Sequence, residues 1–231
     1  MSLRSVERAI EAIRAGEAVL IYDGEEREDE VDMVFPAWVA TPDVIYTLRV
    51  EAGGLLCFAT SSSITSALGI PWGDELLSTY GDLHLIARRR LRYRDRTAFT
   101  IWVNHMSVRT GVSDEDRSIT VRRLDEVVRL AHSGELEGAK KLFSSEFQAP
   151  GHVPILAARS LRERRGHTEM SVTLFSAAGV RPSIVLAEML SKGRVMSVAE
   201  ARAYAEKKGL VMVTGKELMK WCEENEVCWS Y

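Results

Sequence analysis

Asp23-Gly24-Glu25-Glu26-Arg27-Glu28-Asp29-Glu30-Val31-Asp32 is the stretch on which the fold and the chemistry of this chain depend most. Seven of these ten residues are acidic, and apolar runs flank them at 18–22 and 33–35. Both runs are short and rich in β-branched, aromatic and other apolar side chains, so they predict strands. If the stretch is extended, side chains alternate between its two sides, which places four carboxylates together: those of Glu26, Glu28, Glu30 and Asp32.

Such a cluster of carboxylates favours the binding of a divalent cation. Close carboxylates repel one another, and this repulsion raises some of their pKa values. Mg²⁺ relieves the repulsion, because it binds a few carboxylate oxygens together with water and substrate. The alternative is a charged surface loop without a ligand, since runs of charge usually face solvent.

Length and composition describe an ordinary globular protein. With 231 residues the chain suits one large domain or two small ones, and 46% hydrophobic and 27% charged residues are typical of the class. The net charge of -3 gives no general attraction to nucleic acid or to an anionic membrane, so neither is expected as a partner. No apolar run approaches the roughly 20 residues that span a bilayer.

The cysteines and the amino terminus predict the compartment. Cys57, Cys222 and Cys228 are an odd number without metal-binding spacing, which is typical of a reducing cytosol rather than of a disulfide framework. The first residues lead into an amphipathic helix rather than into the apolar core of a signal peptide. A cytoplasmic location is therefore expected.

Hydrophobic periodicity and cap residues predict helices and strands that intermix along the whole chain. Residues 70–96 fit neither pattern, because prolines, glycines and arginines interrupt them. The pattern predicts an α+β fold: a single mixed α/β domain over residues 1–231, with a mixed sheet packed with helices as a layered α/β sandwich. Helices are expected at about 5–15, 41–52, from 118, at 135–143, after 169, after 197 and after 214. Strands are expected at 18–22, 33–35, 55–60, 98–103, 153–158, 183–190 and 210–213.

Two later stretches carry further candidate functional side chains. Pro150-Gly151-His152 is expected to form a loop, with a lone histidine before a strand. In Arg164-Arg165-Gly166-His167-Thr168-Glu169, Thr168 is expected to cap the following helix, whose N-terminus and neighbouring arginines suit a phosphate group. His167 is suited to bind a metal ion through neutral imidazole. Glu188 stands in an apolar strand, where an unpaired glutamate is rare.

Each of these features has an ordinary alternative, such as a histidine in a turn or arginines that face solvent. Together they indicate a site in which carboxylates and a histidine hold a divalent ion and arginine holds a phosphate. Histidine and glutamate are then left for proton transfer. This set predicts an enzyme that acts on a small phosphorylated sugar or polyol, with the metal polarising a carbonyl or hydroxyl group.

The same stretches resemble the 3,4-dihydroxy-2-butanone 4-phosphate synthase family of riboflavin biosynthesis. The resemblance implies conversion of D-ribulose 5-phosphate to L-3,4-dihydroxy-2-butanone 4-phosphate and formate. The implied course is metal-stabilised enediolate formation, dehydration and skeletal rearrangement. One matching block would be weak, whereas six or more in family order are specific. The blocks lie between about residues 5 and 190: Asp23 with 27–33, then 53–57, 97–100, 109–113, 150–153, 164–169 and 178–188.

The resemblance also implies roles for individual residues. Two ions, Mg²⁺ or Mn²⁺, are expected at Glu28 and His167. His152 and Glu188 are expected to transfer protons, with Glu30 and Asp32 as further acid–base candidates. A homodimer is expected, with both active sites at the interface and each partly built by the partner chain. Substrate contacts are expected from Arg27, Glu28, Asp32, Thr110, Arg164, Arg165, Gly166, His167, Thr168 and Glu188.

The sequence departs from the family pattern at several points. Val31 stands where a small residue is common, but in an extended loop it points away from the metal-binding side. Arg165 stands where glycine is common. Residues 88–96 match less well, and so does the tail after about 197, which is expected to be a C-terminal extension. The chain is too short for the GTP cyclohydrolase II domain that follows in some relatives, so a monofunctional enzyme is expected.

Two other functions stay open on the sequence. One is a different metal-dependent enzyme for sugar phosphates, such as an isomerase or an aldolase, which would release no formate. The other is a non-enzymatic binding module built on the acidic loop, for which a divalent ion would change nothing.

Overall fold

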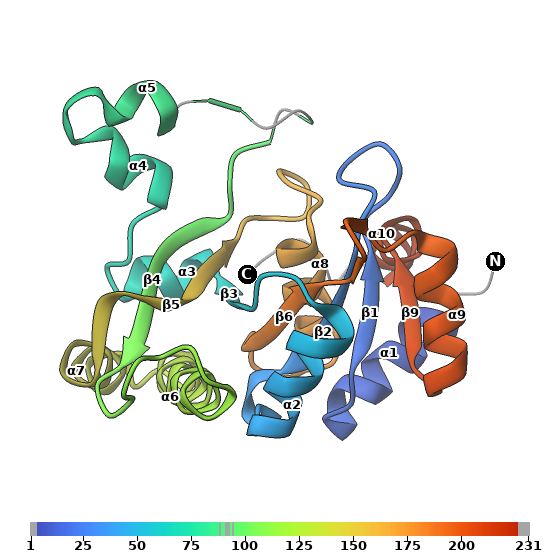
Figure 1. Cartoon of the computed structure of the whole chain (residues 1–231), viewed down its shortest axis with the longest axis horizontal. Helices are drawn as coiled ribbons and strands as arrows, with labels where there is room; N and C mark the ends of the chain where they lie inside the picture. The colour runs from blue at the N-terminus through green and yellow to red at the C-terminus, as the bar shows by residue number, and fades with distance from the viewer. Residues whose placement is uncertain (1–3, 88, 91–92, 94, 226–231) are drawn as a thin grey trace.

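A mixed sheet forms the centre of the computed structural model, which describes residues 4–87, 89–90, 93 and 95–225 (Figure 1). Its strands are β1 (Val19–Tyr22), β2 (Val31–Pro36), β3 (Cys57–Ser61), β4 (Phe99–His105), β5 (Phe147–Ala158), β6 (Ile184–Glu188) and β9 (Val211–Thr214). Within the described residues their order is β4-β5-β3-β6-β2-β1-β9. The pairs β3–β5 and β1–β9 are parallel and the others antiparallel. A small hairpin joins β7 (Leu190–Ser191) to β8 (Arg194–Val195).

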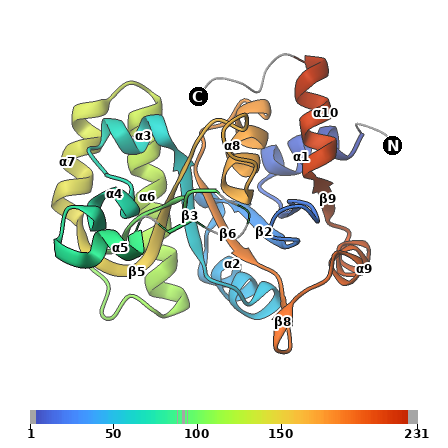
Figure 2. The same ribbon diagram turned by 90° about the horizontal axis from the view of Figure 1, so that it is seen from above.

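Helices cover both faces of this sheet, as Figure 2 shows from above. One core cluster joins the sheet to α1 (Arg4–Ala15), α8 (His167–Ala177) and α10 (Gly215–Asn225). The other joins it to α2 (Pro42–Thr47), the π-helix η2 (Leu48–Ala52), α6 (Asp114–His132) and α9 (Val198–Lys208). The expected α+β class with a mixed sheet between helices is therefore confirmed. The remaining helices are η1 (Ala37–Val39), α3 (Ser62–Ala67), α4 (Gly73–Ser78), η3 (Gly81–Leu83), α5 (His84–Ala87) and α7 (Leu136–Glu146).

Cap residues explain where several helices begin. Ser197 and Glu200 form a reciprocal capping box at the start of α9, the helix expected after residue 197. The helix expected from about residue 118 begins earlier, at Asp114, because the hydroxyl of Ser113 accepts a hydrogen bond from the backbone N–H of Asp116 at 3.0 Å. The acidic first turn of α6 also suits the positive end of the helix dipole.

The expected loop Pro150-Gly151-His152 lies inside a strand instead. β5 begins at Phe147 and contains the cis Ala149–Pro150 peptide. Its pairing with β4 shifts register between Val103 and Asn104, so the strand continues past the proline as an irregular pair. A Cβ atom on Gly151 would lie 2.0 Å from the carbonyl carbon of Val103. Glycine is therefore needed where the two strands come closest.

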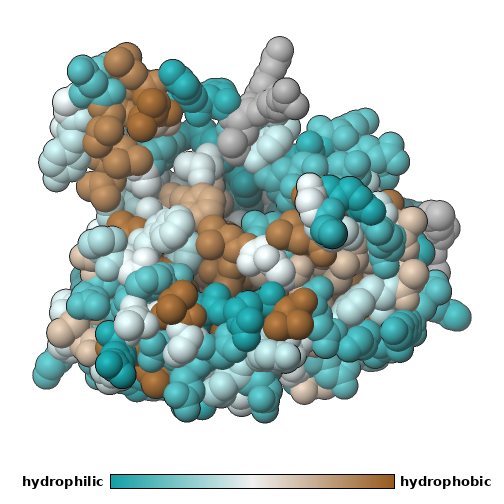
Figure 3. Space-filling view, viewed as in Figure 1, coloured by the Kyte–Doolittle hydropathy of each residue, from teal (hydrophilic) through white to brown (hydrophobic). Residues whose placement is uncertain are grey.

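The segment that fitted no sequence pattern forms a lobe of short helices, α4, η3 and α5. These elements contribute no residue to either core cluster. Figure 3 shows apolar side chains gathered over this lobe at the surface. Its exposed apolar residues are Leu76, Leu77, Tyr80, Leu83, Leu85 and Ile86, between 37% and 62% exposed.

Two sequence expectations about location can be compared with the structure. Cys57 has a free, buried thiol, but Cys222 in α10 is disulfide-bonded, which the cysteine count did not predict. Among the described residues, none of the helices combines the length and the apolar character that crossing a bilayer requires.

Strand directions bring distant parts of the chain to one edge of the sheet. β2 runs antiparallel to both β1 and β6, so β2 begins where those two strands end. Asp32 pairs with Ile21 on one side and with Glu188 on the other. The acidic stretch, which joins β1 to β2, lies at this same edge.

Candidate active site

The acidic stretch forms a folded turn rather than an extended strand. The side chain of Asp23 is fully buried and accepts hydrogen bonds from the backbone N–H groups of Glu28 and Glu30, each at 3.1 Å. Asp29 adopts the left-handed conformation, with φ of 58°. The expected alternation of carboxylates is therefore wrong before residue 31. Glu25 and Glu26 face solvent, whereas Glu28 turns inward.

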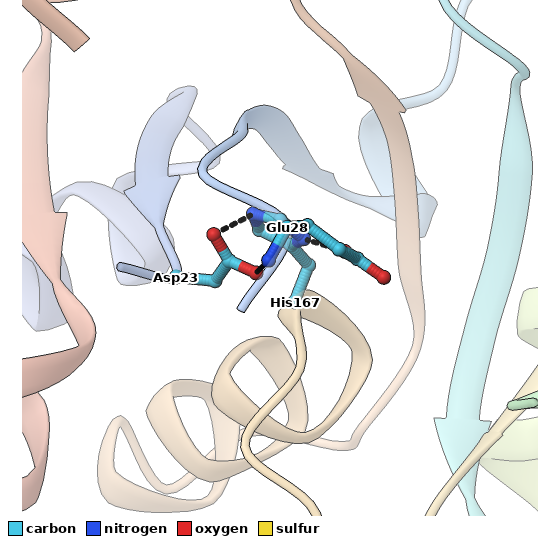
Figure 4. Close-up of side chains that lie close together, drawn as sticks. All are labelled: Asp23, Glu28 and His167. Carbon is cyan, nitrogen blue, oxygen red and sulfur yellow. Dashed lines mark hydrogen bonds and ion pairs between the residues drawn. The ribbon is translucent and has the colours of Figure 1, made fainter. Parts of the chain in front are cut away.

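Glu28 meets His167 at the N-terminus of α8 (Figure 4). One carboxylate oxygen of Glu28 lies 3.2 Å from Nδ1 of His167 and 2.8 Å from Nη1 of Arg27. Its other oxygen accepts a hydrogen bond from the hydroxyl of Tyr93. Burial alone would raise the pKa of Glu28, but these three partners outweigh it and hold the pKa well below its usual range. Glu28 is therefore a carboxylate at neutral pH.

His167 is buried, and its two ring nitrogens face different groups. Nε2 lies 3.1 Å from the backbone carbonyl of Glu30, an acceptor, so Nε2 carries the hydrogen in the neutral ring. Nδ1 is then the nitrogen left to bind a metal ion, and it faces Glu28. Burial lowers the pKa of His167, but Asp32, Glu28 and Asp23 outweigh burial and raise the pKa to about 10.

Asp32 lies beside this pair in a position that is shielded from solvent. It is 2% exposed, and its Oδ1 atom lies 3.7 Å from Nδ1 of His167. In the described part of the chain this buried oxygen has no hydrogen-bond partner. Burial, opposed by His167 and reinforced by Glu188, Glu28 and Glu30, raises the pKa of Asp32 to about 7. A carboxyl group with this pKa can accept or donate a proton near neutral pH.

These side chains make a donor set that fits a hard divalent cation. One ligand atom each from Asp23, Glu28 and His167 lie within 4.8 Å of one another. The carboxylate of Asp23 already accepts hydrogen bonds from the backbone of the turn. Glu28 and His167 are therefore the pair best placed to hold an ion. The unpartnered oxygen of Asp32 supports this fit, because a buried carboxylate oxygen without a donor is costly unless a cation or a proton satisfies it.

The affinity for Mg²⁺ is expected to rise with pH between 7 and 9. The raised pKa of His167, about 10, means that the ring carries a proton that a metal ion must displace. Binding at Nδ1 should therefore release about one proton per site, and affinity should increase up to roughly tenfold per pH unit. Calorimetric titration with Mg²⁺ in buffers of different ionisation enthalpy measures both quantities. An affinity that stays constant over this range would contradict the assignment of His167 as a ligand.

Glu188 is held at the end of β6 by the glycine pair before β3. Its Oε2 atom accepts a hydrogen bond from the backbone N–H of Leu55 at 2.7 Å, and its carbonyl accepts one from Gly54 at 2.9 Å. A Cβ atom on Gly54 would lie 2.3 Å from Oε2 and 2.6 Å from the carbonyl oxygen of Glu188. The side chain of Glu188 is thus positioned by a close backbone approach that only glycine permits.

If Glu188 transfers protons, as the family resemblance implies, Gly54→Ala should lower kcat by about 10- to 100-fold, since displacing a reacting group by an ångström has effects of this size. The added methyl group must push Glu188 out of place. Gly138→Ala is the matched control, because its new Cβ meets only ordinary contact, 3.9 Å from Leu130. Steady-state rates of both variants test the effect, and equal rates would show that the position of Glu188 is unimportant.

The second predicted stretch places its arginines in different environments. Arg164 is 8% exposed and forms an ion pair with Glu169, whose side chain is fully buried; Arg165 is exposed. The N-cap of α8 is Gly166, not Thr168 as expected, because the helix already begins at His167. Thr168 is buried as its second residue.

Arginine side chains gather where Arg27 meets the start of α8. The Nη2 atom of Arg27 is buried and has no hydrogen-bond partner among the residues that the structure describes. A Cβ atom on Gly166 would lie 2.7 Å from that atom and 2.3 Å from Nη1 of Arg164. Two guanidinium groups therefore crowd the start of α8, and this positive charge at a helix N-terminus suits a phosphate group.

Comparison with known proteins shows which family the chain belongs to. The sequence model of 3,4-dihydroxy-2-butanone 4-phosphate synthase matches residues 7–221. The synthase of Methanosarcina mazei is 36% identical over 229 residues, which cover 95% of this chain and 91% of the relative. That of Archaeoglobus fulgidus is 35% identical over 223 residues, 93% and 92% of the two chains. The chain belongs to the 3,4-dihydroxy-2-butanone 4-phosphate synthase family.

Solved structures of the synthase family share the fold. A synthase in complex with two magnesium ions superposes with a TM-score of 0.73 at 28% identity, covering 96% of this chain and 98% of that one. A longer relative, a RibBA protein of Mycobacterium ulcerans, is 32% identical, and the match covers 48% of its length. The predicted family membership is therefore confirmed.

Two residues that the family resemblance implicates lie in a separate cluster. His152 is exposed, and its backbone N–H donates to Oδ1 of Asn104 at 2.8 Å. Thr110 is also exposed, and its carbonyl accepts from Nδ2 of Asn104 at 3.2 Å. Across the described residues, no hydrogen bond or ion pair joins His152 to Glu28, His167 or Glu188. β5 is nevertheless parallel to β3, so His152 lies at the edge where β6 ends.

Sequence reasoning missed three residues that organise the synthase-like site. Asp23 stood in the acidic stretch without a role, and its place directly after a strand was an available signal. Tyr93 donates to Glu28, and its ring lies 4.6 Å from the guanidinium carbon of Arg27. Asn104, a buried amide near the end of β4, joins His152 to Thr110. Nothing in the sequence marked Tyr93 or Asn104.

Proposed function

We propose that this chain converts D-ribulose 5-phosphate to L-3,4-dihydroxy-2-butanone 4-phosphate and formate, as a lyase of riboflavin biosynthesis. The observation that carries the proposal is the cluster of side chains at one sheet edge, where the buried His167 ring lies next to the carboxylates of Glu28 and Asp32. Membership of the synthase family over nearly the whole chain supplies the reaction.

Glu28 and His167 are proposed to hold the divalent ions, Mg²⁺ or Mn²⁺, two in each site. When bound, such ions polarise the carbonyl and hydroxyl groups of the substrate. The related structure with two magnesium ions supports this number. Tyr93 donates to the Glu28 oxygen that faces away from His167, and Arg27 binds the oxygen that faces His167, so both keep the carboxylate charged and oriented.

The reaction needs several proton transfers, because a proton must leave the carbon beside the carbonyl, water must be lost, and one carbon leaves as formate. Asp32 is proposed as one acid–base group, since its pKa of about 7 allows both directions. Glu188 is proposed as another and pairs with Asp32 across two strands. Glu30 is half-buried, and burial together with the Glu28 charge raises its pKa, so it is a further candidate. His152 is proposed to complete the set.

The phosphate group is proposed to bind at the start of α8. Arg27 offers its unpartnered Nη2 atom, and Gly166, His167 and Thr168 offer the helix N-terminus. Arg164 is proposed to contribute through its position beside Gly166, although Glu169 occupies part of its guanidinium group. Arg165 and Thr110 are both exposed and remain predicted substrate contacts.

The test is incubation of the purified chain with ¹³C-labelled ribulose 5-phosphate and Mg²⁺, followed by NMR. Formate and the four-carbon phosphate should appear in equal amounts as the substrate disappears. Chelation should stop the reaction, and added Mg²⁺ should restore it. Epimerised or isomerised pentose phosphate without formate would favour the alternative sugar-phosphate enzyme. No turnover, with unchanged binding of partner proteins on chelation, would favour the binding module.

We propose further that two copies associate, each helping to build the active site of the other. The exposed apolar lobe of α4, η3 and α5 supports an association, because isolated proteins rarely leave such a surface open. Light scattering behind a sizing column should give twice the mass of one chain. The cytoplasmic location, the monofunctional single domain and the extension after about residue 197 stay predictions; cell fractionation and activity of the purified chain test the first two.

A further inference from the structure

Asn104 connects three segments beside His152. It lies near the end of β4, is 4% exposed, and contacts both the irregular part of β5 and the loop before α6. Its Oδ1 atom accepts from the backbone N–H of His152 at 2.8 Å, and its Nδ2 atom donates to the carbonyl of Thr110 at 3.2 Å. These two backbone partners fix which end of the amide is oxygen and which is nitrogen.

Both ends of this amide also reach one ring nitrogen. Nδ1 of His152 lies 3.1 Å from Nδ2 of Asn104 and 3.3 Å from Oδ1. When Nδ1 lacks a hydrogen, Nδ2 can donate to it, and when Nδ1 carries one, Oδ1 can accept it. Every protonation state of the imidazole therefore finds a partner without a rotation of the ring.

The backbone at Gly111 packs against the side-chain amide of Asn104. Gly111 has a φ of 96°, and a Cβ atom there would lie 2.2 Å from Nδ2 of Asn104. The backbone N–H of Gly111 donates to the carboxylate of Asp116 at 2.9 Å, which anchors the loop to α6. Asn104 is thus packed against a fixed loop and cannot turn away from His152.

We propose that Asn104 is a positioning residue that keeps the His152 ring in one orientation while the ring gains and loses a proton. The inference rests on the proposed function, in which His152 transfers protons during turnover. Within the described residues Nε2 of His152 makes no hydrogen bond, so Nε2 is the atom left to face the substrate. A proton taken from the substrate goes to Nε2, while Nδ1–H stays on Oδ1 of Asn104; the reverse transfer returns it.

Asn104→Ala is expected to lower kcat by about 10- to 100-fold, which is the cost of a freely turning catalytic group. The KM for ribulose 5-phosphate and the affinity for Mg²⁺ should not change, because Glu28 and His167 are untouched. Thr100→Val is the matched control: it removes a buried hydrogen bond of 2.8 Å between the same two strands without touching His152. Thr100→Val should keep its kcat.

A double-mutant cycle with His152→Ala separates positioning from simple loss of stability. In the His152→Ala background, Asn104→Ala should change the residual formate rate by less than about twofold, because the group it orients is gone. If circular dichroism shows that Asn104→Ala is unfolded, Asn104→Leu takes its place, since leucine fills roughly the same volume and removes both polar atoms of the amide. Equal losses in both backgrounds, or an unchanged kcat in the single variant, would overturn the inference. A wild-type chain that releases no formate would instead remove the proposed function itself.

Discussion

Glu28→Gln is expected to reduce formate release on the order of 10³-fold, the scale on which lost electrostatic stabilisation acts in enzymes. The amide keeps the shape of the side chain but loses the charge that faces His167 and Arg27. Glutamine also binds a hard cation less well than a carboxylate does. Mg²⁺ affinity, measured by calorimetry, should fall together with the rate, while circular dichroism should show an intact fold.

Glu25→Gln provides the control for this variant, because it removes one negative charge from the same loop at an exposed position. Its rate and its Mg²⁺ affinity should stay within about twofold of the wild-type values, since exposed charges act weakly in water. If Glu25→Gln and Glu28→Gln lose activity equally, the overall negative charge of the loop matters and the inward position of Glu28 does not.

Glu169→Gln should give the largest loss of stability. Glu169 is fully buried, and it binds Arg164 as well as the backbone N–H of Arg159, at 3.0 Å. Removing its charge leaves the Arg164 guanidinium buried without a counter-ion, which costs about 3 to 5 kcal/mol. For a chain of this size, the expected decrease in Tm is on the order of 10 °C. Thermal unfolding followed by circular dichroism measures it.

Glu137→Gln is the corresponding surface variant. Glu137 pairs with Lys140 at 3.2 Å, but its side chain is 89% exposed. Such a pair contributes about 0 to 0.5 kcal/mol, so the Tm should barely change. Similar Tm losses in Glu137→Gln and Glu169→Gln would show that burial of the Arg164 pair is unimportant for stability.

Local patterns predicted those parts of the structure that depend on neighbours in the sequence. Strand alternation correctly sent Val31 to the apolar core and Asp32 to the opposite face of β2. The helix expected after residue 197 begins there, with Ser197 as its N-cap residue. The proposed donor pair, Glu28 and His167, came from residue types and from the family resemblance, and the structure brings these two side chains together.

The sequence predictions that proved wrong or incomplete share one physical cause, which is that they depend on specific contacts that no sequence period encodes. The acidic stretch is folded because Asp23 binds the N–H groups of Glu28 and Glu30, and no periodicity encodes that turn. Tyr93 reaches Glu28 across 65 residues, and Asn104 reaches His152 across 48. Contacts between residues this far apart in the sequence depend on strand register and loop packing, which only the assembled sheet defines.

The pairing of Asp32 with Glu188 across β2 and β6 has a consequence for biosynthesis. A ribosome completes β2 early, but β6 and α8 leave the exit tunnel only after most of the chain has been translated. Until then the carboxylates of the first hairpin have neither their histidine nor their neighbouring strand. The proposed cation site is therefore completed only in the last stages of folding, and a prematurely terminated chain that lacks β6 has no Glu188 beside Asp32.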